Sequence, residues 1–337
     1  MNRQTWQTAA FLGVLAISMF CSVVLAEQGA TTSDAPQTVA KARPFSGVTS
    51  STKNPLQIAL LHWYDANLTT AFTVGTSPRA VAFDGANIWV ANFGSNNVTE
   101  MRASDGTTLG TFGVGTNPIG VAFDGANIWV TNFGSNNVTK LGSDGTTLGT
   151  FGVGIQPDLV AFDGANVWVT NFGSNNVTKL GSDGTTLGTF GVGSSPVGVA
   201  FDGANIWVAN LGSNNVTKLS RSGVTLGTFA AGAGAYALAF DGSNIWVADL
   251  NSNTVTELRA SDGKTLGTFT VGSSPAGVAF DGANIWVANF GSGNVTKLSS
   301  HGATLGTFTV GSLPVGVAFD GANIWVANFG GTTVTKL

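Results

Sequence analysis

The chain has 337 residues, of which 9% are charged, and its 18 Asp and Glu against 14 Lys and Arg give a formal net charge of −4. Electrostatic capture of nucleic acid depends on clustered Lys and Arg side chains, so this acidic balance argues against a nucleic-acid partner. The single cysteine, Cys21, excludes an intramolecular disulfide and a metal site built from several thiolates.

Residues 1–26 are typical of a secretory signal peptide. Arg3 precedes an apolar run over residues 9–25, and the small residue Ala26 completes a cleavage site. The apolar run is short for a membrane span, which needs roughly 20 residues. We therefore predict cleavage and export to the periplasm, the cell surface or the medium, with no membrane span in the mature chain.

Residues 27–53 are rich in Ala, Thr, Ser, Gln and Pro and have no apolar period, which predicts a flexible linker. The remainder, residues 54–337, is interpreted as one repeat array.

A ten-residue phrase occurs seven times in this array, from residues 83–92 to residues 319–328. Its tryptophans are 39 or 40 residues apart, at Trp89, Trp129, Trp168, Trp207, Trp246, Trp286 and Trp325. A period near 40 residues with Gly-rich turns and aromatic punctuation indicates the blades of a β-propeller. The fold class predicted is all-β, a seven-bladed propeller, and we expect a monomer.

Each repeat contains four short strand patterns separated by Asp-Gly and Asn/Ser/Gly turns, as in residues 119–123, 127–132, 137–141 and 146–153 of the second repeat. We therefore predict four-stranded antiparallel blades. The tryptophan of the second strand is interpreted as packing between blades, in preference to a stacking platform for sugars or bases. Lysines recur in the third strand and are interpreted as a solvated rim: Lys140, Lys179, Lys218, Lys297 and Lys336.

The ends of the array predict how the ring closes. The first three strands occur seven times but the fourth only six times, because the chain stops in a third strand at residues 334–337. Residues 65–75 align with residues 105–115, which hold a fourth strand. We therefore predict that residues 66–75 complete the last blade from outside.

The run Trp-Val-Ala/Thr-Asn followed by Phe-Gly-Ser-Asn-Asn-Val-Thr-Lys-Leu, as at residues 129–141, resembles the repeat of the YVTN family of β-propellers, with Trp where that family often has Tyr. The resemblance covers about residues 77–337. It implies an exported or cell-surface propeller, and DNA binding has been proposed for some members. The acidic balance of this chain and its predicted export conflict with DNA binding.

The blades also resemble those of streptogramin B lyase, whose chemistry, as the resemblance implies, depends on histidines and glutamates gathered with a magnesium ion on one face. Here His62 precedes the array, and His301 replaces the Asp of a turn between third and fourth strands. Glu100 and Glu257 lie on third strands, away from the axis. These residues cannot assemble a general base or a metal site at the channel mouth. We therefore predict no catalytic residue, no metal ligand and no cofactor.

The seven Asp-Gly-Ala/Ser-Asn turns offer oxygens that suit calcium, but each turn supplies one Asp and one Asn, whereas a calcium ion takes six to eight oxygens. A hairpin role is the preferred interpretation.

In a nearly symmetric ring, a unique site must come from positions where the repeats differ. The position after the start of the first strand holds Arg79, Ile119, Asp158, Val197, Tyr236, Ala276 and Val315. We expect these residues to surround one mouth of the central channel. Arg79, Asp158 and Tyr236 are the predicted ligand-binding residues, with Gln156 and Asn117 as hydrogen-bonding neighbours. Drift in a tolerant loop is the alternative.

The function predicted is an exported, non-catalytic propeller that acts as a binding or protein-interaction scaffold for a protein or small-molecule ligand at the propeller face. The alternative is a propeller enzyme of the streptogramin-lyase or lactonase type with an axial metal site.

Overall fold

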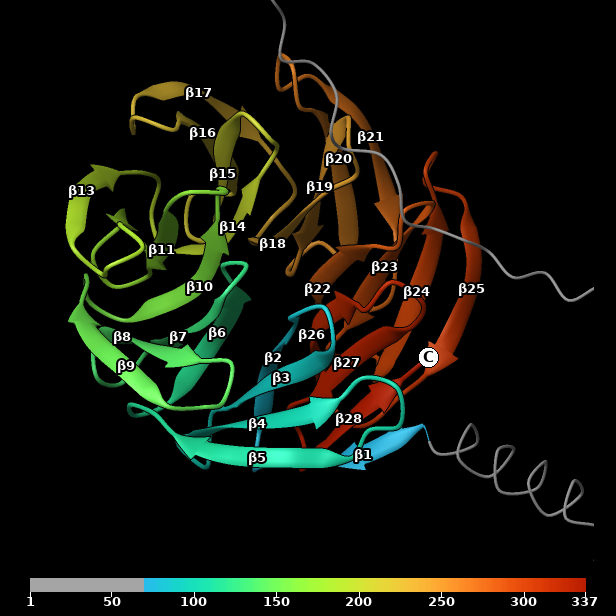
Figure 1. Ribbon diagram of the computed structural model, residues 1–337. Helices are drawn as coiled ribbons and strands as arrows, with labels where there is room; N and C mark the ends of the chain where they lie inside the picture. Colours follow the sequence, from blue (N-terminus) through green and yellow to red (C-terminus); the bar gives the residue numbers. More distant parts are fainter. Residues whose placement is uncertain (1–69) are drawn as a thin grey trace, which may run out of the picture. The chain divides into compact units, whose positions relative to one another are not determined.

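The computed structural model describes residues 70–337, which form seven four-stranded antiparallel sheets arranged around a central axis (Figure 1). The predicted signal peptide, the predicted linker and residues 54–69 lie outside the described residues. Across the part that is described, no helix is long and apolar enough to cross a membrane. The seven-bladed propeller predicted from the repeat spacing is confirmed.

Four strand positions recur in every blade, and we number the blades 1 to 7 from β2 onward. The innermost strands are β2 (Pro78–Phe83), β6 (Pro118–Phe123), β10 (Pro157–Phe162), β14 (Pro196–Phe201), β18 (Ala235–Phe240), β22 (Pro275–Phe280) and β26 (Pro314–Phe319). The second strands are β3 (Asn87–Asn92), β7 (Asn127–Asn132), β11 (Val167–Asn171), β15 (Asn205–Asn210), β19 (Asn244–Asp249), β23 (Asn284–Asn289) and β27 (Ile324–Asn328).

The third strands are β4 (Asn97–Arg102), β8 (Asn137–Gly142), β12 (Asn176–Leu180), β16 (Asn215–Ser220), β20 (Thr254–Arg259), β24 (Asn294–Ser299) and β28 (Thr333–Lys336). The outermost strands are β5 (Thr108–Gly113), β9 (Thr147–Gly152), β13 (Thr186–Gly191), β17 (Thr225–Ala230), β21 (Thr265–Thr270), β25 (Thr304–Thr309) and, from the other end of the array, β1 (Ala71–Thr73).

The ring closes as the strand count predicts. The innermost strands of consecutive blades contact one another around the whole ring, including β26 with β2. In the last sheet, β1 pairs antiparallel with β28, with Phe72 opposite Val334. Phe72 also packs against Trp325, with ring centroids 5.4 Å apart and ring planes tilted by 37°. The N-terminal strand therefore completes blade 7 in pairing and in packing.

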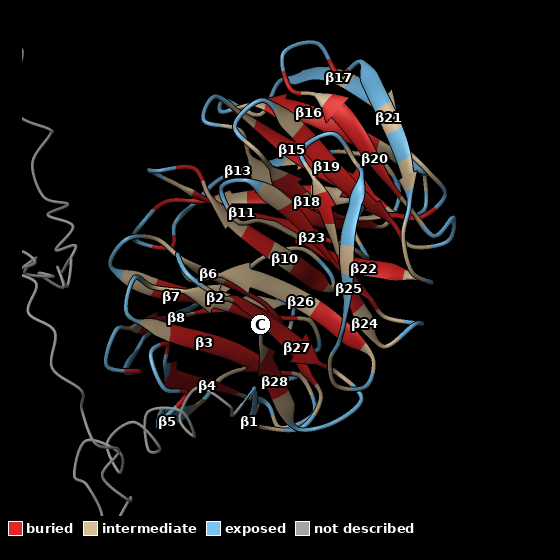
Figure 2. Cartoon of the chain, turned by 90° about the vertical axis from the view of Figure 1, so that its right-hand side faces the viewer, coloured by how far each residue is buried: buried red, intermediate tan, exposed pale blue. Residues whose placement is uncertain are grey.

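The hydrophobic core lies between neighbouring blades, and each of the seven interfaces has its own cluster. Between blades 1 and 2, Trp89 and Val98 pack against Ile128 and Leu141. Six of the seven repeated tryptophans are fully buried and Trp286 is 7% exposed, which confirms the packing role. Burial falls from the inner strands to the outermost ones, such as β17 and β21 (Figure 2).

The Asp of each turn after an innermost strand holds both the turn and the tryptophan. In blade 1, Asp84 Oδ1 accepts the N–H groups of Ala86 and Asn87 at 2.8 and 2.6 Å, and Oδ2 accepts the Trp89 indole N–H at 2.7 Å. The same indole bond, at 2.7–2.8 Å, recurs in the other six blades. Because these carboxylates are already satisfied, the turns are hairpin and core structure, as interpreted from the sequence.

The recurring lysines are not a solvated rim, and that interpretation is wrong. Lys218 is 7% exposed and donates to the Ala260 carbonyl of the next blade at 2.6 Å. The five lysine Nζ atoms lie 4.6–5.2 Å from the centroid of the tryptophan ring of their own blade. Four of these lysines also donate to a backbone carbonyl of the next blade, namely Lys140, Lys179, Lys218 and Lys336. Repeat position alone does not show these bonds between blades, which add to the cation–π contacts.

Candidate functional site

Arg79, Asp158 and Tyr236, supplied by β2, β10 and β18 of blades 1, 3 and 5, line one cavity on the ring axis. This axial cavity has a volume of about 170 Å³ and receives side chains from all seven innermost strands. The structure thus brings together the three polar or aromatic residues of the variable position, although they are separated by up to 157 residues in sequence. Ala276 and Val315, at the same position in blades 6 and 7, also line it.

Arg79 and Tyr236 meet directly across the cavity. Arg79 Nη2 donates to the Tyr236 hydroxyl at 2.6 Å, and the guanidinium carbon lies 5.7 Å from the centroid of the Phe329 ring. Burial acts to lower the pKa of Arg79, but the interaction with Tyr236, including its hydrogen bond, and the negative charge of Asp158 outweigh burial, so the pKa is raised. Burial also raises the pKa of Tyr236. Arg79 therefore stays a cation and Tyr236 a neutral phenol.

Asp158 is the unusual member of the set. It is 4% exposed, and its Oδ1 atom has no hydrogen-bond partner. Burial raises its pKa to about 6, although the positive charge of Arg79 acts in the opposite direction. Among residues 70–337 no ion pair joins the two groups. A buried carboxyl oxygen without a donor is costly, which makes this position a candidate for contact with a ligand.

An apolar ring lines the same cavity two residues further along each innermost strand. We call it the aliphatic collar, and it consists of Val81, Val121, Val160, Val199, Leu238, Val278 and Val317. The collar residues lie two positions further from the strand starts than Arg79, Asp158 and Tyr236, so along each innermost strand they are further from the face on which these strands begin. Among the described residues that line the cavity, Arg79 and Asp158 are the charged ones, so charged ligand groups have partners at their level.

A second apolar ring lies near the polar residues. This aromatic rim consists of the residue that follows each second strand, namely Phe93, Phe133, Phe172, Leu211, Leu250, Phe290 and Phe329, all half-buried. Neighbouring rings lie 6.0–6.5 Å apart in the pairs Phe93–Phe329, Phe290–Phe329 and Phe133–Phe172. Sequence reasoning missed the rim because it treated these residues as part of a turn. Their recurrence in five of seven repeats was the available signal.

Backbone hydrogen bonds fix the rim to the start of the innermost strands. The N–H of each rim residue donates to the carbonyl of the residue just before the innermost strand of its own blade, as Phe93 does to Ser77 at 3.1 Å and Phe329 to Leu313 at 3.0 Å. The rim and the residues of the variable position therefore share one face of the ring.

Gln156 and Asn117 do not line the axial cavity. Both lie in the turns before innermost strands, with positive φ angles of 54° and 51°. Asn117 Nδ2 donates to the Phe93 carbonyl of the preceding blade at 3.3 Å, so this side chain is used between blades. The predicted hydrogen-bonding neighbours of Arg79, Asp158 and Tyr236 are thus not among the residues that line the cavity.

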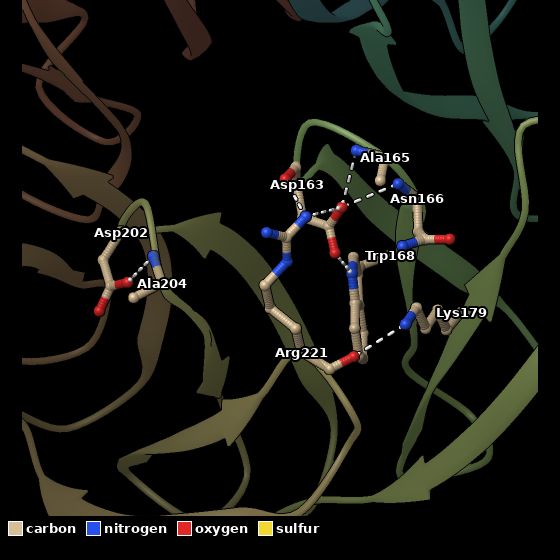
Figure 3. Close-up of polar contacts among 8 residues, drawn as sticks. All are labelled: Asp163, Ala165, Asn166, Trp168, Lys179, Asp202, Ala204 and Arg221. Carbon is tan, nitrogen blue, oxygen red and sulfur yellow. Dashed lines mark hydrogen bonds and ion pairs between the residues drawn. The ribbon is translucent and has the colours of Figure 1, made fainter. Parts of the chain in front are cut away.

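A further departure from symmetry joins blades 3 and 4 (Figure 3). Arg221 Nη2 donates to the Asp163 carbonyl at 2.9 Å and lies 3.3 Å from Asp163 Oδ1, while Lys179 Nζ donates to the Arg221 carbonyl at 2.8 Å. Asp163 Oδ1 also accepts the N–H groups of Ala165 and Asn166. With these contacts satisfied inside the protein, the arrangement stabilises the interface and offers little to a ligand.

The histidine and glutamates weighed as possible catalytic residues stay apart from the axis. Glu100 and Glu257 lie on β4 and β20, and His301 lies in the turn between β24 and β25. Over residues 70–337 no group of three or more His, Cys, Asp and Glu side chains is placed to hold a metal ion. His62 is outside the described residues.

No protein-family model and no curated protein matches this chain. Among solved structures, it is similar to streptogramin B lyase with a TM-score of 0.70 and 17% identity, covering 79% of this chain and 95% of that one. It is also similar to hydrazine synthase of Kuenenia stuttgartiensis (TM-score 0.69, 18% identity, 78% and 97% covered). Virginiamycin B lyase from Staphylococcus aureus is a third such structure (TM-score 0.68, 17% identity, 79% and 97% covered). At these identities the similarity supports the seven-bladed propeller fold alone.

Proposed function

We propose that this protein is an exported, monomeric, non-catalytic propeller that binds a ligand at the axial cavity, and that its repeats are of the YVTN kind. The observation that carries the proposal is the convergence of Arg79, Asp158 and Tyr236 from three separate blades on one cavity. Near-identical repeats would place identical residues there. Three different polar side chains instead make the lining of the cavity asymmetric, so it can recognise a ligand in one orientation.

The test is a small-molecule library screened by thermal shift, with the affinity of each stabilising compound then measured by calorimetry. Arg79→Ala and Tyr236→Phe are expected to weaken binding of such compounds by about tenfold or more, because each removes a hydrogen bond at a charged group. Arg102→Ala is the matched control, since it breaks the exposed Arg102–Asp105 ion pair at 2.9 Å, away from the cavity. Binding that survives both cavity substitutions would exclude this site.

The alternative function is a propeller enzyme of the lyase or lactonase type with an axial metal. The structural similarity to streptogramin B lyase and virginiamycin B lyase favours it at the level of fold. Within the described residues, Asp158 is the one carboxylate that lines the axial cavity. Metal analysis of the purified protein separates the two proposals, because a stoichiometric metal that is lost in Asp158→Asn would support the enzyme.

A further inference from the structure

We propose that the axial cavity binds a small zwitterion with an apolar, ring-sized side chain, of the amino-acid class. This inference rests on the proposed function, and it names the chemistry of the ligand. It follows from two opposite charges with unused hydrogen-bonding capacity, held between two apolar rings.

Arg79 and Asp158 both have unused hydrogen-bonding capacity. Arg79 has five N–H donors, and within residues 70–337 its one hydrogen bond is from Nη2 to Tyr236. Asp158 Oδ1 has no partner, although the residue is 4% exposed and lines the cavity. A ligand acceptor can therefore take the free Arg79 donors, and a ligand donor can bind Asp158.

Arg79 and Asp158 carry opposite charges and line the same cavity. Because the two groups share a cavity without forming an ion pair, a ligand with one charge would satisfy one of them and leave the other desolvated and unpaired. A carboxylate placed at Arg79 and an ammonium placed at Asp158 satisfy both at once. The Tyr236 hydroxyl can then donate its own proton to the same carboxylate, since it accepts from Arg79.

Apolar side chains surround the space that remains for the rest of the ligand. The aromatic rim approaches the charged residues through Phe329, whose ring faces the Arg79 guanidinium, and the aliphatic collar lies on the other side. Neither the aromatic rim nor the aliphatic collar contains a polar side chain. A cavity of about 170 Å³ is smaller than the roughly 300–1,000 Å³ of pockets for drug-sized ligands, so a single amino acid suits it better than a longer chain.

The experiment compares three probes that share one phenyl skeleton: phenylalanine, 3-phenylpropionate and phenethylamine. Calorimetry near neutral pH is expected to show phenylalanine binding about tenfold more tightly than either singly charged probe. Asp158→Asn removes the anion and should shift the preference to 3-phenylpropionate. Arg79→Gln removes the cation and should shift it to phenethylamine. Arg102→Ala should leave the order of the three probes unchanged.

The results separate this inference from the proposed function. The inference that the ligand is a zwitterion is wrong if a singly charged probe binds the wild-type protein as tightly as phenylalanine or more tightly. It is also wrong if phenylalanine does not bind. If library compounds still bind the wild-type protein and fail to bind Arg79→Ala, ligand binding at the cavity is supported although the ligand is not a zwitterion. If they bind both proteins equally, the proposed function falls as well. An exchange of preference between the Asp158→Asn and Arg79→Gln variants supports the inference even if their stability differs from wild type.

Discussion

Asp249 is the position at which one substitution should make this propeller more stable. Six second strands end in Asn, and the second strand of blade 5 ends in Asp249, which is fully buried. Its Oδ2 accepts the hydroxyls of Thr254 and Thr256 at 3.1 and 2.7 Å, and its Oδ1 accepts the Gly232 N–H at 3.0 Å. Despite these bonds, burial raises its pKa to about 6.

Blade 7 shows how an asparagine would fit beside the same two threonine positions. There, Asn328 Nδ2 donates to Thr333 Oγ1 at 3.1 Å and to Thr335 Oγ1 at 2.9 Å. In Asp249→Asn the amide can form the equivalent pair of bonds, because the threonine hydroxyls can accept as well as donate. The amide oxygen can keep the Gly232 N–H that Asp249 Oδ1 accepts, whereas the Oδ1 of Asn328 is buried without a partner. The substitution therefore removes a buried charge while each group of the new amide has a partner.

The magnitude follows from the pKa. When the folded-state pKa of an acid exceeds its unfolded value, the folded protein binds more protons, so stability falls as pH rises between the two values. For Asp249 the interval extends from 3.8 to about 6. The difference corresponds to about 3 kcal/mol, present as a cost above the upper value and absent below the lower one. Asp249→Asn should thus gain about 2–3 kcal/mol near neutral pH and almost nothing near pH 4.

Urea unfolding of the wild-type protein and Asp249→Asn, repeated at several pH values, measures this gain directly. The wild type should lose stability between about pH 4 and pH 6, and part of that loss should remain in the variant because Asp158 also has a pKa of about 6. The reverse substitution, Asn328→Asp, should destabilise blade 7 only at the higher pH. A gain that is the same at both ends of the range, or no gain at all, would refute the reasoning.

Three further substitutions test the packing between blades. Phe72→Ala should cost about 3 kcal/mol in thermal unfolding and deletion of residues 66–75 still more, because both open the ring at blade 7; an unchanged Tm after the deletion would rule out closure by β1. Arg221→Ala should cost about 0.5–1 kcal/mol, since Arg221 is half exposed while its partner Asp163 is buried, and a neutral result in urea would show that the contact contributes nothing. Burial and nearby aspartates raise the pKa of Glu100, so Glu100→Lys should stabilise by up to about 1 kcal/mol near pH 7, and lower stability at that pH would count against a lysine contact there.

Most of the fold could be predicted because the sequence repeats one unit. The spacing of Trp89 and its six counterparts gives the number of blades, and the missing fourth strand at the C-terminus places Phe72 beside blade 7. Contacts between blades were harder to predict. Lys218 looks exposed from its own strand, and only the position of the Ala260 carbonyl in the next blade explains its burial.

The candidate site could be predicted in part for the same reason. Equivalent positions of a ring face the axis together, so Arg79, Asp158 and Tyr236 could be expected to converge without knowledge of their side-chain directions. The side chain of Asn117 was not predictable, because its turn has a positive φ angle and directs the amide to the preceding blade. The aromatic rim was missed because its phenylalanines were interpreted as turn residues, although their recurrence in five of seven repeats was visible in the sequence.

Asp158 and Asp249 show how a binding residue can be distinguished from sequence drift in a symmetric protein. Both are buried, and burial raises the pKa of each to about 6, so each lowers stability at neutral pH. Both oxygens of Asp249 accept hydrogen bonds, and two of these bonds come from threonine hydroxyls that suit an asparagine equally well. This is the pattern expected of sequence drift. Asp158 Oδ1 accepts none and belongs to a residue that faces Arg79 across a cavity. An unpaired acid at that place is a cost to folding that a ligand donor can offset, so Asp158→Asn should stabilise the free protein while it changes what the protein binds.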